Sequence, residues 1–231
     1  MDTTILHMDL DTFFVSCERL LDSRLMKRPL LVGGLGDRGV VAACSYETRR
    51  SGVHSGMSMK VARRLCPEAT VIKGNAGTYM GFSDNVTEII RESVPVFEKA
   101  SVDEFYADLS GMDRFFGCYR YASELRQRIL RETGLPMNKV VSKVATGEAK
   151  PNNQMKIDLG YEREFLAPLS IRKLPSVGEK TYGLLSNMGV ATIRTLQEMP
   201  LEMMESGFGV HGRTIWMRAH GLDNPPLVPF H

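Results

Sequence analysis

Short apolar runs alternate with amphipathic segments along residues 1–165, and this alternation predicts strands interleaved with helices. The segments expected to be strands are 3–8, 28–34, 40–44, 71–72, 95–100 and 104–109. The segments expected to be helical are 13–21, 46–50, 58–66, 78–92 and 116–132. Because several strands follow one another as hairpin neighbours do, we expect an α+β fold with a mostly antiparallel sheet.

A different pattern begins at about Leu166. From there the chain shows short helical segments that are broken by glycines, and no strand pattern. We therefore expect a separate all-α unit over residues 166–224. The last residues, 225–231, are rich in proline and resemble a linker.

The N-terminal apolar run ends in two carboxylates, Asp9 and Asp11. Alternation along a strand puts both on one face, with Leu10 on the other. Two like charges this close repel each other unless a cation lies beside them. The simpler interpretation is that the strand ends at Met8 and passes into an acidic turn.

A second acidic pair, Asp103 and Glu104, lies between two expected strands and is flanked by Val102 and Phe105. Apolar neighbours make this pair a poor candidate for a solvated surface. Together with Asp9, the pair would supply the oxygen ligands that Mg²⁺ prefers. Two such ions clamp the attacking and leaving oxygens in phosphoryl transfer. The residues alone do not show that the two acidic segments meet in space.

Composition adds little to this picture. The chain has 231 residues, of which 43% are hydrophobic and 24% charged, as is usual for a globular protein. Its net charge is only +2, so the charge of the whole chain does not indicate that it binds nucleic acid. Its four cysteines are scattered and favour reduced thiols over disulfides or zinc ligands. Since there is no apolar run of membrane-spanning length and no leader pattern, we expect a soluble cytoplasmic protein.

Four motifs follow one another in a characteristic order: 9–14 (DLDTFF), 46–49 (YETR), 101–104 (SVDE) and 149–152 (AKPN). In this order they resemble Y-family translesion DNA polymerases, most closely the DNA polymerase IV branch, and the similarity extends from end to end. The resemblance implies a palm over residues 1–20 and 75–165 and a small α/β fingers insertion over 21–74. It also implies an all-α helix-hairpin-helix thumb over 166–224, followed by the start of a linker over 225–231 to a little-finger domain that this chain lacks.

The resemblance assigns the metal ligands. Asp9 and Asp103 would bridge two Mg²⁺ ions, for which Mn²⁺ can substitute. Glu104 would complete the ion that activates the primer 3′-hydroxyl, and the carbonyl of Leu10 would join the ion that holds the triphosphate. Asp11 would support the site without binding metal.

The same resemblance assigns the nucleotide-binding residues. Phe14 matches the steric gate, whose ring fills the space of a ribose 2′-hydroxyl, and Phe13 precedes it with its own ring in the core. Tyr46 and Arg49, three residues apart on one helical face, would donate to the β- and γ-phosphates. Lys150 would reach the triphosphate from the palm.

Further positions are implied for DNA. Val40, Ala42 and Gly56 match small residues over the nascent base pair, although ordinary strand and turn residues would look the same. In the thumb, Val177 and Gly178 match a hairpin whose backbone N–H groups hold a DNA phosphate. The flanking Lys173 and Lys180 would add phosphate contacts. A plain turn between helices is the alternative for this hairpin.

The chain departs from the family pattern in three places. Ala43 stands where the family commonly has Thr or Ser. Residues 132–139 lack about half a dozen residues that form a palm strand, so either the sheet is rearranged or the sequence omits a segment, and we favour omission. Finally, no little-finger domain follows, which predicts weak, salt-sensitive DNA binding and low processivity.

Primer-template DNA and a dNTP are therefore the expected partners, and a monomer is the expected state. A sliding clamp would bind a region beyond this chain. The binding-protein alternative is a non-catalytic DNA-damage scaffold of the same family, but such relatives lose acidic ligands that are present here. A nucleotidyl cyclase would leave Tyr46, Arg49 and Lys150 without a purpose. A bare helix-hairpin-helix module would explain only the last quarter of the chain.

Overall fold

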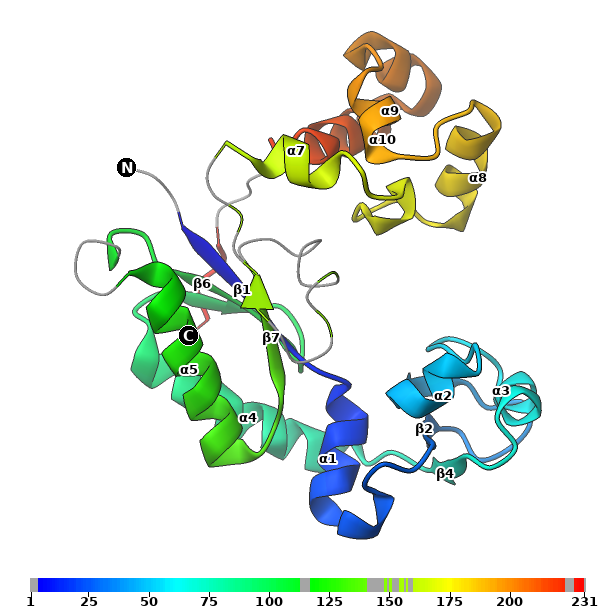
Figure 1. Ribbon diagram of the computed structural model, residues 1–231, viewed down its shortest axis with the longest axis vertical. Helices are drawn as coiled ribbons and strands as arrows, with labels where there is room; N and C mark the ends of the chain where they lie inside the picture. The colour runs from blue at the N-terminus through cyan, green and yellow to red at the C-terminus, as the bar shows by residue number, and fades with distance from the viewer. Residues whose placement is uncertain are drawn as a thin grey trace.

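The structure is a computed structural model that describes residues 4–112, 117–140, 148, 150, 154–155, 157, 160–222 and 227–230. Its elements fall into three groups (Figure 1). We use palm for the larger sheet with α1, α4 and α5, fingers for the smaller sheet with α2 and α3, and thumb for α7 to α10. The predicted α+β class is confirmed, whereas the residue boundaries of the three parts stay predictions.

The palm sheet has the strand order β5-β6-β1-β7-β8. Its strands are β1 (Ile5–Leu10), β5 (Phe97–Lys99), β6 (Glu104–Asp108), β7 (Met137–Val140) and β8 (Gln154–Met155). The pairs β5·β6, β6·β1 and β1·β7 are antiparallel, and only β7·β8 is parallel. The expectation of a mostly antiparallel sheet is therefore confirmed.

Strand β1 extends further than the sequence pattern suggests. It continues through Asp9 to Leu10, because the ladder with β6 runs on and the Leu10 amide donates to the Asp103 carbonyl at 2.9 Å. The expected acidic turn after Met8 is thus wrong, and Asp9 lies inside the strand. Helix α1 (Phe13–Leu21) then begins at the predicted residue, after Thr12 in a left-handed conformation (φ 44°).

The palm strand that the sequence seemed to lack has a substitute. Met137–Val140 forms β7 directly after residues 134–136 and pairs with β1 over four residues, from His7↔Val140 to Leu10↔Met137. Strand β1 is therefore paired on both sides, with β6 and with β7. The Met137 side chain is fully buried, so this strand also contributes to the core.

Two helices, α4 (Ala76–Ser93) and α5 (Cys118–Thr133), lie side by side against the palm sheet (Figure 1). The palm core forms where the apolar face of the sheet meets these helices, and its fully buried members include Met8, Ile90, Phe105 and Ile129. Along β6, buried Phe105 and Ala107 alternate with half-exposed Glu104, Tyr106 and Asp108. This alternation leaves the Glu104 face of the sheet available for chemistry.

The fingers contain a three-stranded sheet of order β3-β2-β4. Its elements are η1 (Ser23–Leu25, a 3₁₀ helix), β2 (Leu30–Gly33), β3 (Val41–Cys44), α2 (Tyr46–Arg50), α3 (Met59–Leu65) and β4 (Thr70–Ile72). Strand β2 pairs antiparallel with β3 and parallel with β4. Leu31, Val41 and Met59 are buried and belong to a small core separate from that of the palm. The expected α/β fingers unit is therefore present.

The thumb contains only helices among its described residues, as predicted. They are α7 (Glu162–Leu166), η3 (Ile171–Lys173, a 3₁₀ helix), α8 (Glu179–Asn187), α9 (Ile193–Gln197) and α10 (Leu201–Ala219). Gln197 of α9 links this helix to α7 and α10, because its side-chain amide donates to the carbonyls of Arg163 and Ala219. Helix α10 is kinked at Gly209, whose φ of 60° is not helical.

The segment 227–230, expected to belong to a linker, lies along the outer strand of the palm sheet. The Phe230 amide donates to the Phe97 carbonyl at 2.8 Å, and the Val228 amide donates to a carboxylate oxygen of Glu98 at 2.8 Å. The rings of Phe230 and Phe97 lie 5.6 Å apart. This contact covers part of the edge strand β5. In the described part of the chain, no helix has both the length and the apolar character needed to cross a membrane.

Candidate active site

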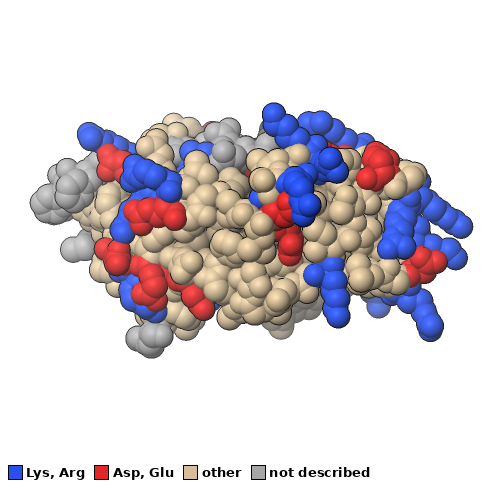
Figure 2. All heavy atoms as spheres, turned by 90° about the horizontal axis from the view of Figure 1, so that it is seen from below, with Lys and Arg blue, Asp and Glu red and all other residues tan. Residues whose placement is uncertain are grey.

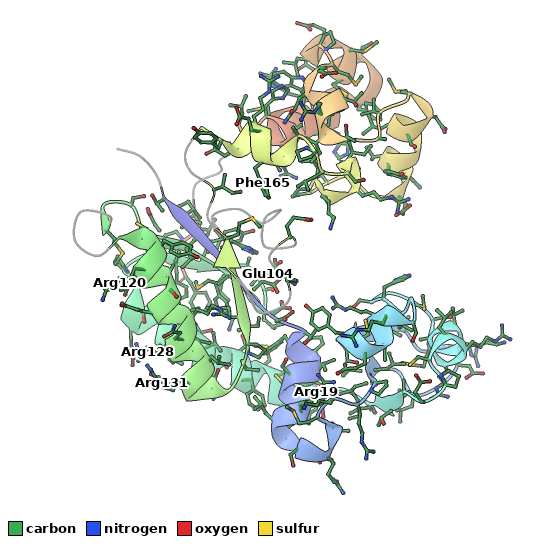
Figure 3. The ribbon with its side chains drawn as sticks, viewed as in Figure 1. Arg19, Glu104, Arg120, Arg128, Arg131 and Phe165 are labelled. Carbon is green, nitrogen blue, oxygen red and sulfur yellow. The ribbon has the colours of Figure 1, made fainter. Side chains whose placement is uncertain are left out.

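Strand pairing brings the two acidic segments together. In the antiparallel register of β1 and β6, Asp9 lies directly opposite Glu104, so their side chains share one face of the sheet. The hydrogen bond from the Leu10 amide places Asp103 one step further along the same ladder. Figure 3 shows Glu104 near the middle of the molecule, with palm helices on one side and fingers and thumb on the other. The meeting in space that the residues alone did not show is thus a feature of the fold.

Asp9 is the most enclosed of the three carboxylates. The residue is only 8% exposed, and its Oδ1 lies 2.7 Å from Nζ of Lys150. Burial raises the pKa of Asp9, and the charges of Asp103 and Glu104 add to this effect, while Lys150 opposes it. The predicted nucleotide ligand Lys150 is therefore paired with a predicted metal ligand.

The other two carboxylates contact different neighbours. The Ser101 hydroxyl donates to Asp103 at 2.6 Å and accepts from the Glu104 amide at 3.1 Å. Glu104 lies 4.0 Å from Nε2 of His7, which is buried and stacks near Tyr106 with 4.5 Å between ring centroids. Each acidic side chain thus has its own polar neighbour in this structure.

These residues suit a divalent cation in kind and in backbone position. Carboxylates on adjacent strands, together with a backbone carbonyl such as that of Leu10, are oxygen donors of the type that Mg²⁺ prefers. In the residues that the structure describes, no three Asp, Glu, His or Cys side chains are gathered closely enough to hold an ion. A divalent ion at this position would therefore be held by one or two of these carboxylates, with the remaining oxygens supplied by backbone, water or substrate phosphate.

The predicted phosphate ligands lie on α2 of the fingers. Ser45 caps this helix by accepting from the Thr48 amide at 3.4 Å. The Tyr46 hydroxyl donates to Oδ1 of Asp11 at 2.6 Å, and burial together with this bond raises the pKa of Tyr46. The guanidinium carbon of Arg49 lies 5.0 Å from the centre of the Tyr46 ring. Asp11 thus holds Tyr46 against the palm, while its role in supporting the metal site stays a prediction.

A second contact links the same parts. The guanidinium of Arg19, on α1, lies 3.0 Å from a carboxylate oxygen of Glu47, on α2, and also donates to the carbonyls of Leu25 and Arg28. In Figure 3 the Arg19 side chain lies on α1, on the side of the fingers. The position of α2 relative to α1 is therefore supported by polar contacts at Tyr46 and at Glu47.

The expected steric gate is packed against an aromatic partner. Phe14 is half-buried and stacks on Tyr79 of α4, with ring centroids 4.5 Å apart and planes inclined by 20°. Phe13 is buried in the palm core, as expected of it. The Tyr79 hydroxyl donates to Glu18 at 2.6 Å, which fixes the ring on which Phe14 rests.

Val40 and Ala42 lie on one exposed face around buried Val41, because side chains alternate along this part of the fingers sheet. Gly56 is exposed and has φ of 86°, a left-handed conformation that favours glycine. Its amide donates to the Val41 carbonyl at 2.8 Å, so the turn lies close to β3. The three residues predicted for the templating pocket are therefore neighbours on an open surface of small side chains.

The predicted phosphate-binding hairpin lies between η3 and α8. Gly178 caps α8 without a side-chain bond, and Val177 packs partly against the thumb core. Lys180 is exposed in the first turn of the helix. Lys173 is not free on the surface, because its Nζ lies 3.0 Å from Glu148. The hairpin lies at the N-terminus of α8, and its role in binding a DNA phosphate stays a prediction.

Positive charge is concentrated in the fingers. Residues 21–74 contain ten Lys and Arg and four Asp and Glu, a net charge of +6 against +2 for the whole chain. Figure 2 shows these basic side chains gathered at the fingers end of the molecule. The modest net charge of the chain therefore conceals a local attraction for polyanions.

Comparison with known proteins identifies the family. The model described as "impB/mucB/samB family" matches residues 8–147, and the model described as "DNA polymerase-iota, thumb domain" matches residues 172–223. This chain belongs to the impB/mucB/samB family. The first match contains both acidic segments, and the second contains the hairpin at Val177 and Gly178.

Curated relatives of this impB/mucB/samB chain are named DNA polymerase IV. One from Dehalococcoides mccartyi strain CBDB1 is 38% identical over 231 residues, which cover 96% of this chain and 59% of the relative. One from Streptomyces coelicolor is 38% identical over 235 residues, covering 97% and 49%. This chain therefore spans only about half to three fifths of the length of these relatives.

Solved structures agree with the fold. DinB from Sulfolobus solfataricus superposes with a TM-score of 0.87 at 24% identity, over 96% of this chain and 68% of the other. The insertion ternary complex of Dbh DNA polymerase gives 0.86 at 24% identity, over 96% and 69%. The resemblance to Y-family polymerases of the polymerase IV branch is thus confirmed for this member of the impB/mucB/samB family.

Some residues of the site were not found from the sequence. Tyr79 lies 65 positions after Phe14, and nothing in the motif order links the two. His7 could be read only as an apolar-strand residue, although it lies beside Glu104. A signal for Tyr79 existed in its placement on the apolar face of a long helix, where a hydroxyl needs a partner.

Proposed function

We propose that this chain carries the nucleotidyl-transfer centre of a template-directed DNA polymerase, which joins a dNTP to a primer 3′-hydroxyl and acts in low-fidelity synthesis past damaged template bases. The observation that carries the proposal is the register of β1 and β6, which puts Asp9 opposite Glu104 and next to Asp103. Relatives named DNA polymerase IV support it. This chain spans only 59% and 49% of the length of these two relatives.

In this proposal Asp9, Asp103, Glu104 and the Leu10 carbonyl hold two divalent ions, with Mg²⁺ as the natural ion and Mn²⁺ as a substitute. The bound ions would favour the ionised primer hydroxyl and offset the charge on the phosphorus centre and the leaving pyrophosphate. Burial of Asp9 keeps water from competing for its oxygens. The sheet fixes the distance between the strands that carry these carboxylates. Side chains on strands are held more precisely than side chains on loops.

The fingers and palm then bind the nucleotide. Arg49 donates to its phosphates from helix α2 of the fingers, and Lys150 does so from the palm. Tyr46 donates as well once its single hydroxyl proton turns from Asp11 to a phosphate oxygen. The ring of Phe14, held against Tyr79, excludes a 2′-hydroxyl. Val40, Ala42 and Gly56 leave room above the base pair, which suits altered template bases.

Primer-template DNA is the proposed macromolecular partner. The backbone amides near Val177 and Gly178, with Lys180, hold a phosphate of the duplex without reading its bases. The positive fingers add a salt-dependent attraction. We propose that the chain acts as a monomer in the cytoplasm.

Primer extension tests this function. Wild type with Mg²⁺ and single dNTPs should add the base that pairs with the template. Asp103→Asn and Glu104→Gln should each lower the rate by about a hundredfold or more, since each removes a charge that acts on the transition state. Asp108→Asn is the matched control, because Asp108 is a half-exposed carboxylate further along the same strand.

Two outcomes would contradict the proposal. Extension that persists in both ligand variants would exclude the two-metal assignment. DNA binding without any extension by wild type, at all Mg²⁺ and Mn²⁺ concentrations, would favour a non-catalytic DNA-damage scaffold instead.

A further inference from the structure

The ion pair between Lys150 and Asp9 is short and poorly accessible to water. Nζ of Lys150 lies 2.7 Å from Oδ1 of Asp9, and the two side chains are 29% and 12% exposed. Most surface ion pairs contribute little because water screens them. This pair is more enclosed, so breaking it without a replacement leaves a carboxylate that has lost both its cation and most of its water.

Asp9 also needs a cation for a second reason. It lies directly opposite Glu104, and the charges of Asp103 and Glu104 both act on it unfavourably. A buried carboxylate among other carboxylates is stable only with a positive charge nearby. In this structure the positive charge that contacts Asp9 is the ammonium of Lys150.

The neighbouring carboxylates have polar partners of their own. Asp103 accepts from the Ser101 hydroxyl, and Glu104 lies 4.0 Å from the buried His7 ring. Nothing in the described part of the site gathers the acidic side chains around one centre. At Asp9, the contact that offsets the carboxylate charge is the Lys150 ammonium.

We propose that Lys150 is a placeholder for the divalent ion at Asp9. Its ammonium neutralises Asp9 until an ion binds, and it must then leave, since a monovalent and a divalent cation beside one carboxylate repel each other. Once released, Lys150 can pair with an anionic phosphate. The inference deepens the proposed function, because it rests on the metal site assigned there.

This exchange has a regulatory consequence. A divalent ion that arrives alone must break the pair and leaves Lys150 without a partner, so binding is weakened. An ion that arrives with a triphosphate supplies Lys150 with a new anionic partner. Metal and nucleotide binding are therefore coupled through one side chain, and coupling of this kind acts equally in both directions.

Mn²⁺ binding in the absence of nucleotide and DNA tests the placeholder. Calorimetry or the electron paramagnetic resonance signal of free Mn²⁺ gives the dissociation constant for wild type and for Lys150→Met, which keeps the length of the side chain without its charge. We expect Lys150→Met to bind Mn²⁺ about tenfold more tightly, because the competing cation is gone. Lys99→Met is the matched control, since it breaks a Lys–Asp pair of 3.2 Å that does not involve Asp9, and it should bind as wild type does.

A second measurement compares the wild-type chain with and without Mn²⁺, so its main result does not depend on whether a variant folds. Brief acetylation of lysines, followed by peptide mass spectrometry, reports how free each amine is. Mn²⁺ should increase labelling of Lys150 severalfold and leave Lys173 unchanged. In Asp9→Asn, Lys150 should already be labelled readily without metal.

The outcomes separate the two proposals. If Asp9→Asn binds Mn²⁺ as tightly as wild type, the metal site itself is wrong. If Asp9→Asn loses binding, but Lys150→Met gains no affinity and Mn²⁺ leaves Lys150 labelling unchanged, the metal site stands and the placeholder is overturned.

Discussion

The hydroxyl of Tyr46 donates a 2.6 Å hydrogen bond to Oδ1 of Asp11, and this bond joins the first helix of the fingers to the residue that follows β1. Asp11 is only 4% exposed, so water cannot readily replace the donor. Together with the Arg19–Glu47 pair, it couples the proposed phosphate ligands to the strand that carries Asp9. The distance between the proposed metal ligands and the proposed phosphate ligands is thereby set by side chains as well as by the backbone.

Tyr46→Phe should therefore cost more than the loss of a surface hydroxyl. A hydrogen bond to a charged group contributes about 1.5–3 kcal/mol, and its loss leaves the buried Asp11 poorly satisfied. We expect the free energy of unfolding in urea to fall by about that amount, and KM for dNTP to rise. Tyr161→Phe is the control, since Tyr161 is 61% exposed, and it should change neither quantity. Equal stability of the two variants would show that the bond to Asp11 is unimportant.

The stack of Phe14 on Tyr79 predicts a graded loss of sugar selection. Phe14→Ala removes the proposed gate and should raise ribonucleotide incorporation about tenfold or more relative to dNTP incorporation. Tyr79→Leu removes the ring behind the gate and should give a smaller increase. Tyr79→Phe keeps the ring and loses only the bond to Glu18, so selection should remain close to wild type.

Competition between matched dNTPs and rNTPs in single-nucleotide extension measures these ratios. An unchanged ratio in Phe14→Ala would remove the gate assignment. A Tyr79→Phe variant as permissive as Tyr79→Leu would show that the hydroxyl, and not the stacked ring, holds Phe14.

Much of the fold follows from local pattern, and α1 shows why. Its apolar residues recur at helical spacing from Phe13, and the structure begins and ends the helix at the predicted residues. The end of β1 was predicted two residues too early, because a carboxylate looks like a turn signal until its partner strand is known. Asp9 stays in the strand because β6 supplies ladder partners from about a hundred residues away.

The parts that local pattern cannot reach are contacts between distant side chains. The motif order places Lys150 and Asp9 in the same site, but it does not say that the two side chains pair with each other. The docking of Phe230 on β5 joins residues 133 positions apart and leaves no periodic signal in either segment. The short segment before Met137 left a rearranged sheet and an omitted segment as alternatives, and it did not indicate which residues would pair with β1; the structure pairs Met137–Val140 with that strand.

The four cysteines predict a protein that thiol reagents do not modify in its native state. Cys17, Cys44, Cys66 and Cys118 are all buried, and burial raises the pKa of Cys17 to about 12. Titration with Ellman's reagent at pH 8 should find no fast-reacting thiol before urea is added and four afterwards. Rapid reaction of one thiol without denaturant would show that its segment opens readily.

The same shift predicts a fall in stability at alkaline pH. A thiol whose pKa is raised in the folded state contributes to stability. This contribution is fully present at pH values below the pKa that the same thiol has in the unfolded chain. As pH rises above about 8.5, the unfolded thiol ionises and the folded one does not, so the free energy of unfolding should decrease toward pH 12. Cys17→Ala should flatten this slope, and an unchanged slope would assign the decrease to other groups.

The final prediction concerns two glycines of α10. A Cβ at Gly212 would lie 2.0 Å from the Met204 carbonyl oxygen, which is backbone and cannot move aside as a side chain does. A Cβ at Gly207, in the same helix, meets nothing within 4 Å. The two positions therefore give a matched pair of substitutions in one helix, around the kink at Gly209.

Gly212→Ala should lower the free energy of unfolding by about 3 kcal/mol or more, because the kinked halves of α10 must separate to admit the methyl group. Gly207→Ala should be neutral or raise stability by up to about 1 kcal/mol, since alanine favours a helix over glycine. Thermal unfolding measures both. Because α10 packs on the thumb core and not on the palm sheet, Gly212→Ala should weaken duplex binding while Mn²⁺ binding by the palm persists. Joint loss of both would show that thumb and palm fold as one cooperative unit.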